Sequence, residues 1–375
     1  MDLAIHASKG NPTPYMIQLD ALRALAVFGV LVHHFLPGSF LSRVLNWGQL
    51  GVQLFFLLSG YLITGILLRC RERVELNKQD TWFTLRRFYI RRFLRLIPIY
   101  YLVLIITALL NFEPVRRSLV WHLTYTSNIY FSILNRWDGC VSHFWSLSVE
   151  EQFYLFWPFI IMLAPKKYLH SILFIAVFIG PISRFLCIAA GLNTYWRWTM
   201  LFTNLDLLAM GAVLAFYNQN LEWKKRYKYK AYLCKFGFWI GIPLLAAFTI
   251  INYRYPHHVV LKIFYQSTMS LCFVWLVNSA SQGFSGAIGS VLEFKLLTYL
   301  GKISYGIYVY HNFVPTIIRH IFRAMGLSIS KSVHIQFILF TIVTLLISAI
   351  SWHLIEKPIN NLKEHFGYIN RQSNE

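Results

Sequence analysis

Long apolar stretches recur along the chain and are separated by short polar segments. Each is close to the roughly 20 residues that a helix needs to cross the hydrocarbon core of a bilayer. We predict ten spans, at 17–36, 50–69, 97–112, 144–164, 169–190, 197–217, 233–252, 260–280, 296–318 and 335–355. A further stretch, 117–135, is a candidate for a re-entrant or interfacial helix. The pattern predicts an all-α, polytopic transmembrane helix bundle.

Basic residues indicate the orientation of these spans. The basic loops all follow even-numbered segments, and they are 70–96 (Arg71, Arg73, Lys78, Arg86, Arg87, Arg91, Arg92, Arg95), 165–168 (Lys166, Lys167) and 218–232 (Lys224, Lys225, Arg226, Lys228, Lys230). Cytosolic loops of membrane proteins are enriched in Lys and Arg. We therefore expect these loops, and with ten spans both termini, to be cytosolic.

Composition agrees with a membrane domain. The 375 residues are 57% hydrophobic and 13% charged, whereas soluble domains carry about 25% charged residues. The net charge of +20 comes from short loops between apolar runs, which indicates membrane surface and not nucleic acid. The five cysteines form no paired motif, so we expect no disulfide framework and no metal site. We divide the chain into a polar N-terminal segment (1–16), a membrane domain (17–356) and a short cytosolic tail (357–375).

The first predicted span carries charged groups on one helical face. Arg23 and His34 are eleven positions apart, which is three turns plus about 20°, and roughly 16 Å along the axis. Asp20 lies near the same face. A histidine suits a general base for a sugar hydroxyl, and an arginine suits an anionic carrier group. The alternative is that Arg23 pairs with Asp20 as an anchor and that His34 is a hydrogen-bonded packing residue.

Two adjacent carboxylates open the fourth predicted span. Glu150 and Tyr154 are neighbours at i and i+4, whereas Glu151 faces another direction. An acid at a helix N-terminus complements the dipole, which explains one of them. The other is a candidate to orient a histidine or to neutralise Arg23.

An arginine-rich helix precedes the third predicted span. Arg87, Arg91 and Arg95 share one face, and Arg92 flanks it. Such a helix either anchors the protein to lipid phosphates or clamps the phosphates of coenzyme A.

A polar face also crosses the ninth predicted span. Ser304, Tyr308 and His311 share it, and nearby glycines such as Gly301 permit close helix packing. The face either packs against a neighbour or lines a cavity. Asp206 and Glu356, near span ends, are interpreted as structural.

Six segments together resemble the acyltransferase 3 family of membrane O-acyltransferases. They are LDALRALAVFGVLVHHF with Arg23 and His34, GVQLFFLLSGYLIT, RRFLRLIPIYY with Arg92 and Arg95, HFWSLSVEEQFYLFWP, LGKISYGIYVYH and IEKP. The resemblance covers residues 17–360. The chain departs from it at Gln53, where the family often has an acidic residue.

The resemblance implies transfer of an acyl group, most often acetyl, from cytosolic acyl-CoA to a hydroxyl of a cell-surface saccharide or glycolipid in a bacterial inner membrane. The implied site comprises catalytic His34, Arg23, Glu150 and Glu151, donor-binding Arg91, Arg92, Arg95 and Arg23, and substrate-lining Trp145, Ser146, Tyr154, Tyr305, Tyr308 and His311. His34 would act as the base, directly or after a covalent acyl step.

Two other functions stay open at this stage. The acceptor could be a small secondary metabolite such as a macrolide, or the chain could be a glycolipid transporter or flippase. Many relatives carry an extracytoplasmic esterase-like domain that we do not find here. We therefore expect the chain to act alone or with a separate extracytoplasmic acyl-handling protein.

Overall fold

The computed structural model describes residues 15–38, 45–77, 79–219, 224–255 and 258–368. Within these ranges every regular element is a helix, so the predicted all-α class is confirmed. Most of the polar N-terminal segment and the end of the predicted tail lie outside the described residues.

The chain folds in the following order. The first half comprises α1 (Ile17–Phe35), α3 (Trp47–Asn77), α4 (Thr81–Leu109), α5 (Glu113–Arg117), α6 (Leu119–Leu123), α7 (Ser127–Leu134), η1 (Gly139–Val141), α8 (Phe144–Leu163), α9 (Lys166–Ala189), α10 (Thr194–Thr199) and η2 (Phe202–Asn204). The second half comprises α11 (Leu205–Gln219), α12 (Lys224–Phe236), η3 (Gly237–Gly241), α13 (Ile242–Arg254), α14 (Val259–Gln282), α15 (Gly286–Leu292), α16 (Lys295–Lys302), α17 (Ser304–Tyr310), α18 (Phe313–Ala324), α19 (Val333–Ser351), η4 (Trp352–Glu356), α20 (Lys357–Asn361) and η5 (Leu362–His365).

Seven helical stretches in the described part are long and apolar enough to span a bilayer. They are Ile17–Phe35, Trp47–Leu76, Thr81–Leu109, Lys166–Ala189, Lys230–Ile251, Val259–Gln282 and Val333–His365. Each overlaps one of the ten predicted spans. Of the other three, 144–164 forms the single helix α8, whose hydropathy is lowered by consecutive Glu150, Glu151 and Gln152. The segment 197–217 is divided between α10, η2 and the 15-residue α11.

The predicted span at 296–318 is not one helix. It is divided into α16, α17 and the start of α18, with turns at Ile303 and at His311. At Gly301 this segment meets α1, because a Cβ there would lie 1.9 Å from the carbonyl oxygen of Asp20. The broken helices thus bring the Ser304–His311 segment beside α1, where a straight span could not follow the same path.

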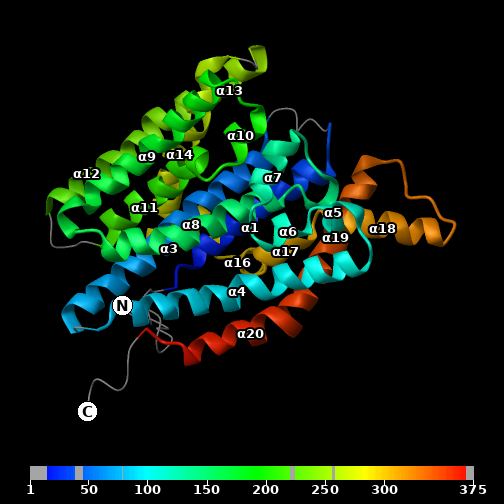
Figure 1. The fold of residues 1–375 in the computed structure, drawn as a ribbon. Coiled ribbons are helices and arrows are strands. Elements are labelled where there is room, and N and C mark those ends of the chain that lie inside the picture. Colours follow the sequence, from blue (N-terminus) through cyan, green and yellow to red (C-terminus); the bar gives the residue numbers. More distant parts are fainter. Residues whose placement is uncertain (1–14, 39–44, 78, 220–223, 256–257, 369–375) are drawn as a thin grey trace.

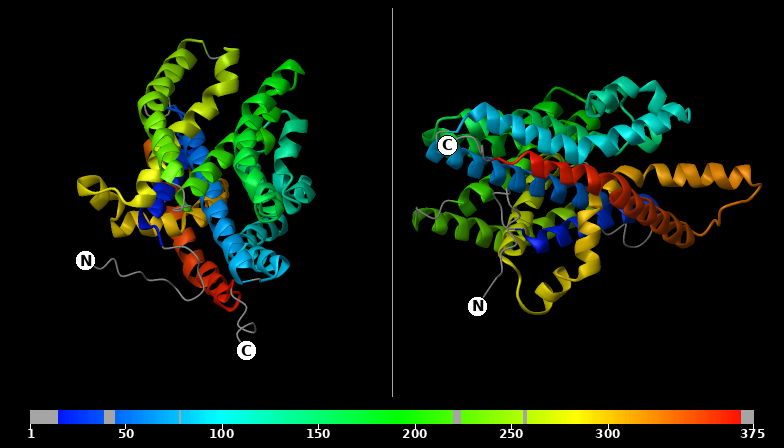
Figure 2. Two further views of the ribbon diagram at one scale, coloured as in Figure 1. Left: turned by 90° about the vertical axis from the view of Figure 1, so that its left-hand side faces the viewer. Right: turned by 90° about the horizontal axis from the view of Figure 1, so that it is seen from below.

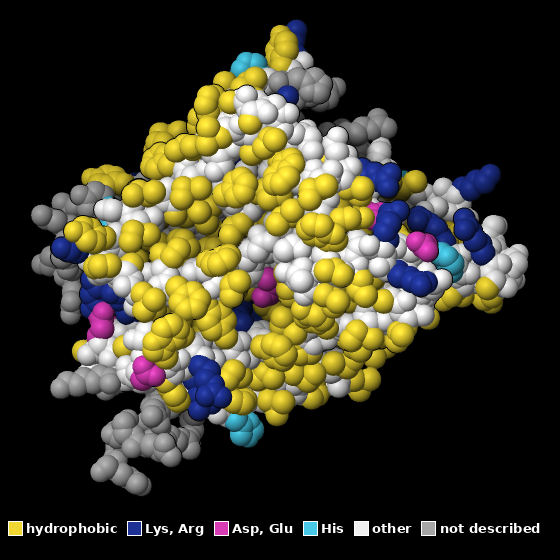
Figure 3. Space-filling view, viewed as in Figure 1, with side chains coloured by type: hydrophobic (Ala, Val, Ile, Leu, Met, Phe, Trp, Pro, Cys, Tyr) yellow, Lys and Arg dark blue, Asp and Glu magenta, His cyan; other side chains and the backbone are white. Residues whose placement is uncertain are grey.

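The exterior of the bundle is apolar, as a lipid-facing surface requires. Ile105 on α4, Phe156 on α8 and Leu186 on α9 are each more than half exposed. Figure 3 shows hydrophobic side chains across the middle of one face, with basic side chains gathered towards its left and right ends. The helices run between these two ends (Figure 1). The fold is therefore that of an integral membrane helix bundle.

Close helix packing positions the interior. A Cβ at Gly60 of α3 would lie 1.9 Å from the carbonyl oxygen of Leu208, and one at Gly211 of α11 would lie 2.1 Å from that of Leu57. Only glycine permits backbones to approach this closely. Gly60 and Gly211 thus form the seam along which α3 packs against α11. Helix α1 runs through the middle of the bundle against α3 and α16 (Figures 1 and 2).

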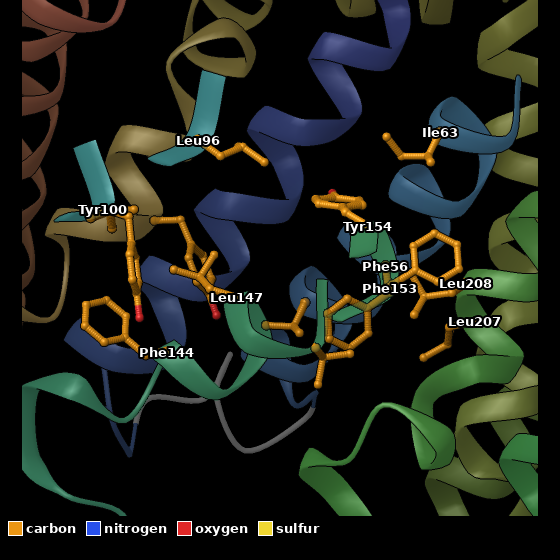
Figure 4. Packing of buried hydrophobic residues seen from close by; sticks show 14 of the residues in the cluster. Phe56, Ile63, Leu96, Tyr100, Phe144, Leu147, Phe153, Tyr154, Leu207 and Leu208 are labelled. Atoms are coloured by element: carbon orange, nitrogen blue, oxygen red, sulfur yellow. The ribbon is translucent and has the colours of Figure 1, made fainter. Parts of the chain in front are cut away.

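A shared apolar core joins α3, α4, α8 and α11. Phe56 and Ile63 come from α3, Leu96 and Tyr100 from α4, Phe144, Leu147, Phe153 and Tyr154 from α8, and Leu207 and Leu208 from α11 (Figure 4). The core fixes α3, α4 and α8, three of the helices that line the candidate site.

Candidate functional site

Two cavities lie next to each other inside the bundle. The first, which we call the basic cavity, has a volume of about 690 Å³. It is lined by Arg23, Val52, Phe55, Phe56, Ser59, Leu62, Ile63, Arg92, Arg95, Leu96, Ser146, Leu147, Glu150, Tyr154, Ser304, Tyr305 and Tyr308. Three guanidinium groups and one carboxylate thus converge on a space whose other walls are largely apolar.

Hydrogen bonds fix the polar groups of the basic cavity. The Arg23 guanidinium donates to the Asp20 carboxylate at 2.6 Å, so the pairing considered as an anchor exists. Ser59 donates to the Glu150 carboxylate at 2.8 Å and accepts from the Tyr154 hydroxyl at 2.9 Å. Arg92 lies 5.2 Å from the centre of the Tyr154 ring. Guanidinium groups held in this way can bind a phosphorylated ligand through charge-assisted hydrogen bonds.

The arginine-rich face of α4 is divided between two tasks. Arg92 and Arg95 line the basic cavity, whereas Arg91 donates to the backbone carbonyls of Lys363 at 2.7 Å and Phe366 at 3.3 Å. Arg87 likewise lies against this C-terminal segment, beside the His365 carbonyl. The segment runs along α4 in Figure 1. Arg91, expected to bind the donor, hydrogen-bonds to the C-terminal segment and does not line the basic cavity.

The second cavity, which we call the neutral cavity, has a volume of about 1350 Å³. It is lined by Val30, His33, His34, Asn46, Gly48, Gln49, Val52, Gln53, Trp137, Ser142, His143, Trp145, Thr194, Tyr195, Trp198, Asn204, Gln266 and Tyr308. None of these described lining residues is Lys, Arg, Asp or Glu. Arg23 and His34, predicted on one face of α1, thus line different cavities.

Histidines cluster at one wall of the neutral cavity. The His311 ring lies 4.9 Å from the His34 ring and 4.8 Å from the His143 ring, between centroids. His311 Nδ1 is 2.6 Å from the Tyr308 carbonyl, which can only accept, so Nδ1 carries the proton and Nε2 keeps its lone pair. His311, expected to line a substrate site, supports His34 from behind and lines neither cavity. His143 completes the cluster, although the sequence analysis gave it no role.

The two cavities share Val52 and Tyr308 in their walls. The Tyr308 hydroxyl lies 2.5 Å from Ser146 Oγ, and Ser146 lines the basic cavity. The expected lining residues Ser146, Tyr154, Tyr305 and Tyr308 all line the basic cavity, and Trp145 lines the neutral one. Tyr308 and Val52 therefore lie at the boundary between the basic cavity and the cavity that His34 lines.

The two adjacent glutamates face different spaces. Glu150 lines the basic cavity with Arg23 and not the neutral cavity with His34. Glu151 lines a third cavity of about 1080 Å³ between α4 and α8, together with Arg92 and Gln152. Figure 3 shows acidic and basic side chains in the middle of the apolar face. Glu150 therefore lies in the cavity of Arg23, the cation that it was also considered to neutralise, and neither carboxylate lines the cavity of His34.

Several polar residues of the neutral cavity were missed. Asn204 and Gln266 lie within predicted spans, and Gln53 was noted only as a departure from the family pattern. Polar side chains inside apolar segments are a usable signal, since burying them is costly without a partner. Trp137 and Trp198 gave no such signal, because tryptophans near span ends are typical of the membrane interface.

Comparisons with known proteins find relatives that are named as O-acetyltransferases. A protein of Staphylococcus aureus (strain MSSA476) named "Putative O-acetyltransferase SAS0844" is 29% identical over 366 residues, covering 92% of this chain and 57% of its own length. "Peptidoglycan O-acetyltransferase OatA" of Listeria monocytogenes is 29% identical over 383 residues, covering 92% of this chain and 56% of its own length. "Putative peptidoglycan O-acetyltransferase YrhL" of Bacillus subtilis is 28% identical over 377 residues, with 92% and 55% covered.

The chain thus spans a little over half the length of these curated relatives. No solved structure matches it. The acyltransferase 3 family, described as an acyltransferase domain, matches residues 16–353, which is nearly the whole chain. The chain therefore belongs to the acyltransferase 3 family and forms an integral membrane helix bundle.

Proposed function

We propose that the protein transfers an acyl group, most simply acetyl, from cytosolic acyl-CoA to a hydroxyl of a saccharide. The basic cavity would hold the donor, the neutral cavity the acceptor, and His34 would be the base. The observation that carries this proposal is the separation of charge between two adjoining cavities. One presents Arg23, Arg92 and Arg95, and the other contains His34 and no charged side chain among its described lining residues.

The donor assignment rests on charge and position. Coenzyme A carries phosphates, which guanidinium groups bind with charge-assisted hydrogen bonds. Arg92 and Arg95 belong to the end of the 70–96 basic segment that the positive-inside rule assigns to the cytosol. A donor held there by its phosphates would point its thioester towards Tyr308.

The chemistry assigned to His34 is general base catalysis. Its imidazole would take the proton of the acceptor hydroxyl while the oxygen attacks the thioester carbonyl carbon. The carbon–sulfur bond then breaks, and the departing CoA thiolate takes up a proton from the imidazolium. A positioned base of this kind contributes about 10²–10⁴-fold to a rate.

Peptidoglycan is the first acceptor to test, because two relatives carry that polymer in their names. We place the protein in the bacterial cytoplasmic membrane, and such an acceptor lies on the outer side of that membrane. Transfer would then carry the acyl group from a cytosolic donor to an extracytoplasmic hydroxyl.

The test is release of free CoA from acetyl-CoA by the purified protein, with and without a glycan fraction. We compare the wild type with His34→Ala and Arg23→Ala. Acceptor-dependent release that falls at least a hundredfold in His34→Ala supports the base assignment. Equal release in His34→Ala and wild type would remove that assignment and leave the acyltransferase. Absence of release with every acyl-CoA, from folded protein that binds glycolipid, would favour a transporter.

A further inference from the structure

Two amides in the neutral cavity have unused hydrogen-bonding atoms. Neither the Oε1 nor the Nε2 atom of Gln53 has a hydrogen-bond partner among the described residues, although its side chain is only 2% exposed. The Oδ1 atom of Asn204, a fully buried residue, also has no hydrogen-bond partner among the described residues. Its Nδ2 donates to the carbonyls of Trp198 at 2.7 Å and Met200 at 2.9 Å. A buried polar atom without a partner carries an uncompensated desolvation cost, so such atoms are rare unless water or a ligand pairs with them.

Aromatic rings form a continuous wall of the same cavity. The Trp137 ring lies 4.8 Å from the Tyr195 ring and 6.5 Å from the Trp145 ring, between centroids. All three line the cavity. Rigid aromatic faces bind the apolar face of a ligand at little entropic cost, and amides bind its donors and acceptors.

The charge of the ligand follows from what the cavity lacks. The described lining residues include no cationic group to neutralise a carboxylate or phosphate and no carboxylate to neutralise an amine. Burying an ionised group without a counter-charge costs several kcal/mol. An amide such as that of Gln53 both donates and accepts, which suits a hydroxyl or an acetamido group.

From these observations we infer that the neutral cavity binds an uncharged sugar unit, with Gln53 and Asn204 as specificity-determining residues that hydrogen-bond its hydroxyl or acetamido groups. This inference rests on the proposed function for the identity of the cavity as the acceptor site. It adds that the sugar unit presented to His34 carries no carboxylate, phosphate or free amine, whatever the charge of the polymer elsewhere.

The experiment measures binding and not turnover. The full chain in lipid nanodiscs is titrated with chitotetraose and maltotetraose as neutral probes, hyaluronan tetrasaccharide as an acidic probe and chitosan tetraose as a cationic probe. Tryptophan fluorescence reports occupancy, because Trp137, Trp145 and Trp198 line the cavity. We expect quenching by at least one neutral probe and at least tenfold weaker binding of the charged probes. Equal or tighter binding of a charged probe, or no binding of either neutral probe, overturns the inference.

Gln53→Leu separates ligand binding from a structural role. Because the Gln53 amide has no partner to lose, its replacement should leave the melting temperature unchanged or raise it, while the Kd for the neutral probe rises about tenfold, the loss of roughly 1.4 kcal/mol of hydrogen bonding. Gln336→Leu is the matched control. Gln336 donates to the Ser330 carbonyl at 2.8 Å and lines neither cavity, so this change should lower stability and leave binding unchanged.

Gln53→Glu provides the second arm, because it adds a carboxylate of nearly the same shape. This variant should bind chitotetraose more weakly and chitosan tetraose more tightly than the wild type does. Unchanged preference in both variants would show that Gln53 does not contact the ligand. If the probes bind as expected but no acyl-CoA is consumed, the sugar site stands and the acyl-transfer proposal fails. If acyl transfer occurs but acidic sugar units are the preferred acceptors, the acyl-transfer proposal stands and the inference of a neutral sugar site fails.

Discussion

The hydroxyl groups of Tyr308 and Ser146 are joined by a 2.5 Å hydrogen bond at the boundary between the two cavities. Both hydroxyls also lie within hydrogen-bond distance of the His143 carbonyl, Ser146 Oγ at 3.0 Å and the Tyr308 oxygen at 3.4 Å. The Tyr308 side chain lines both cavities, and its carbonyl accepts from His311. One residue thus forms part of the partition and also orients the histidine behind His34.

This relationship predicts that Tyr308 limits leakage between the cavities. Tyr308→Phe removes the hydrogen bond and keeps the ring, so we expect a stability loss of about 1 kcal/mol and a modest rise in acetyl-CoA hydrolysis without acceptor. Tyr308→Ala opens the partition, and its hydrolysis-to-transfer ratio should rise further. The ratio is measured as CoA release with and without glycan. A ratio that stays at the wild-type value in Tyr308→Ala would show that the partition lies elsewhere.

Arg92 and Arg95 are predicted to bind the acyl donor, whereas Arg91 is predicted to stabilise the fold. Arg92→Ala or Arg95→Ala removes a guanidinium from the basic cavity, and we expect KM for acetyl-CoA to rise about tenfold, the loss of one charge-assisted contact. Arg91→Ala is the matched control on the same helix. It loses its bonds to the Lys363 and Phe366 carbonyls, so the melting temperature should fall while KM stays constant. A raised KM in Arg91→Ala alone would reverse the assignment.

The helical membrane fold could be predicted from the chain because each apolar run is a local property. The helical i, i+4, i+8 spacing placed Arg87, Arg91 and Arg95 on one face of α4, but it could not indicate what that face contacts. The C-terminal segment returns along α4 and uses Arg91, which is a tertiary contact between residues about 270 apart. The same limit applies to α1, whose single polar stripe serves two cavities.

The break at 296–318 and the buried pair of Arg184 and Asp206 show two other limits. Hydropathy did not distinguish a straight span from α16 and α17, because no Pro or polar run marks the turn at Ile303, which follows the close contact of Gly301 with α1. Arg184 lies inside the apolar segment 169–190 and could have been singled out as an ionisable residue within a span. Its partner Asp206 was interpreted from the sequence as structural, and its ion pair with Arg184 agrees with that interpretation.

The ion pair between Arg184 and Asp206 is predicted to be essential for stability. Arg184 Nη2 lies 2.7 Å from Asp206 Oδ2, both side chains are at most 1% exposed, and Arg184 also donates to Gln266 Oε1 at 2.6 Å. Removing one partner leaves a buried charge, which costs about 3–5 kcal/mol. Asp206→Ala and Arg184→Ala should therefore lower the melting temperature in detergent strongly.

The double variant Arg184→Met with Asp206→Leu tests the cause. It leaves no unpaired charge, so it should be more stable than either single variant at these positions. Because Gln266 lines the neutral cavity, the double variant should still bind the neutral sugar more weakly than wild type. Additive losses of stability in the double variant would show that the charges act independently.

Stability is predicted to fall with acidification through His122. This histidine lies in α6, in the connector between α4 and α8, and its two ring nitrogens lie 2.8 Å from Ser118 Oγ and 2.7 Å from Ser127 Oγ. Burial lowers its pKa to about 4, against an ordinary value of 6.5. Between these values the unfolded chain binds a proton that the folded chain excludes, so the free energy of unfolding decreases as the pH falls from 6.5 to 4. His122→Gln does not titrate, and its melting temperature should therefore decline less than that of wild type over this interval. Parallel declines of wild type and His122→Gln would assign the acid sensitivity to other groups.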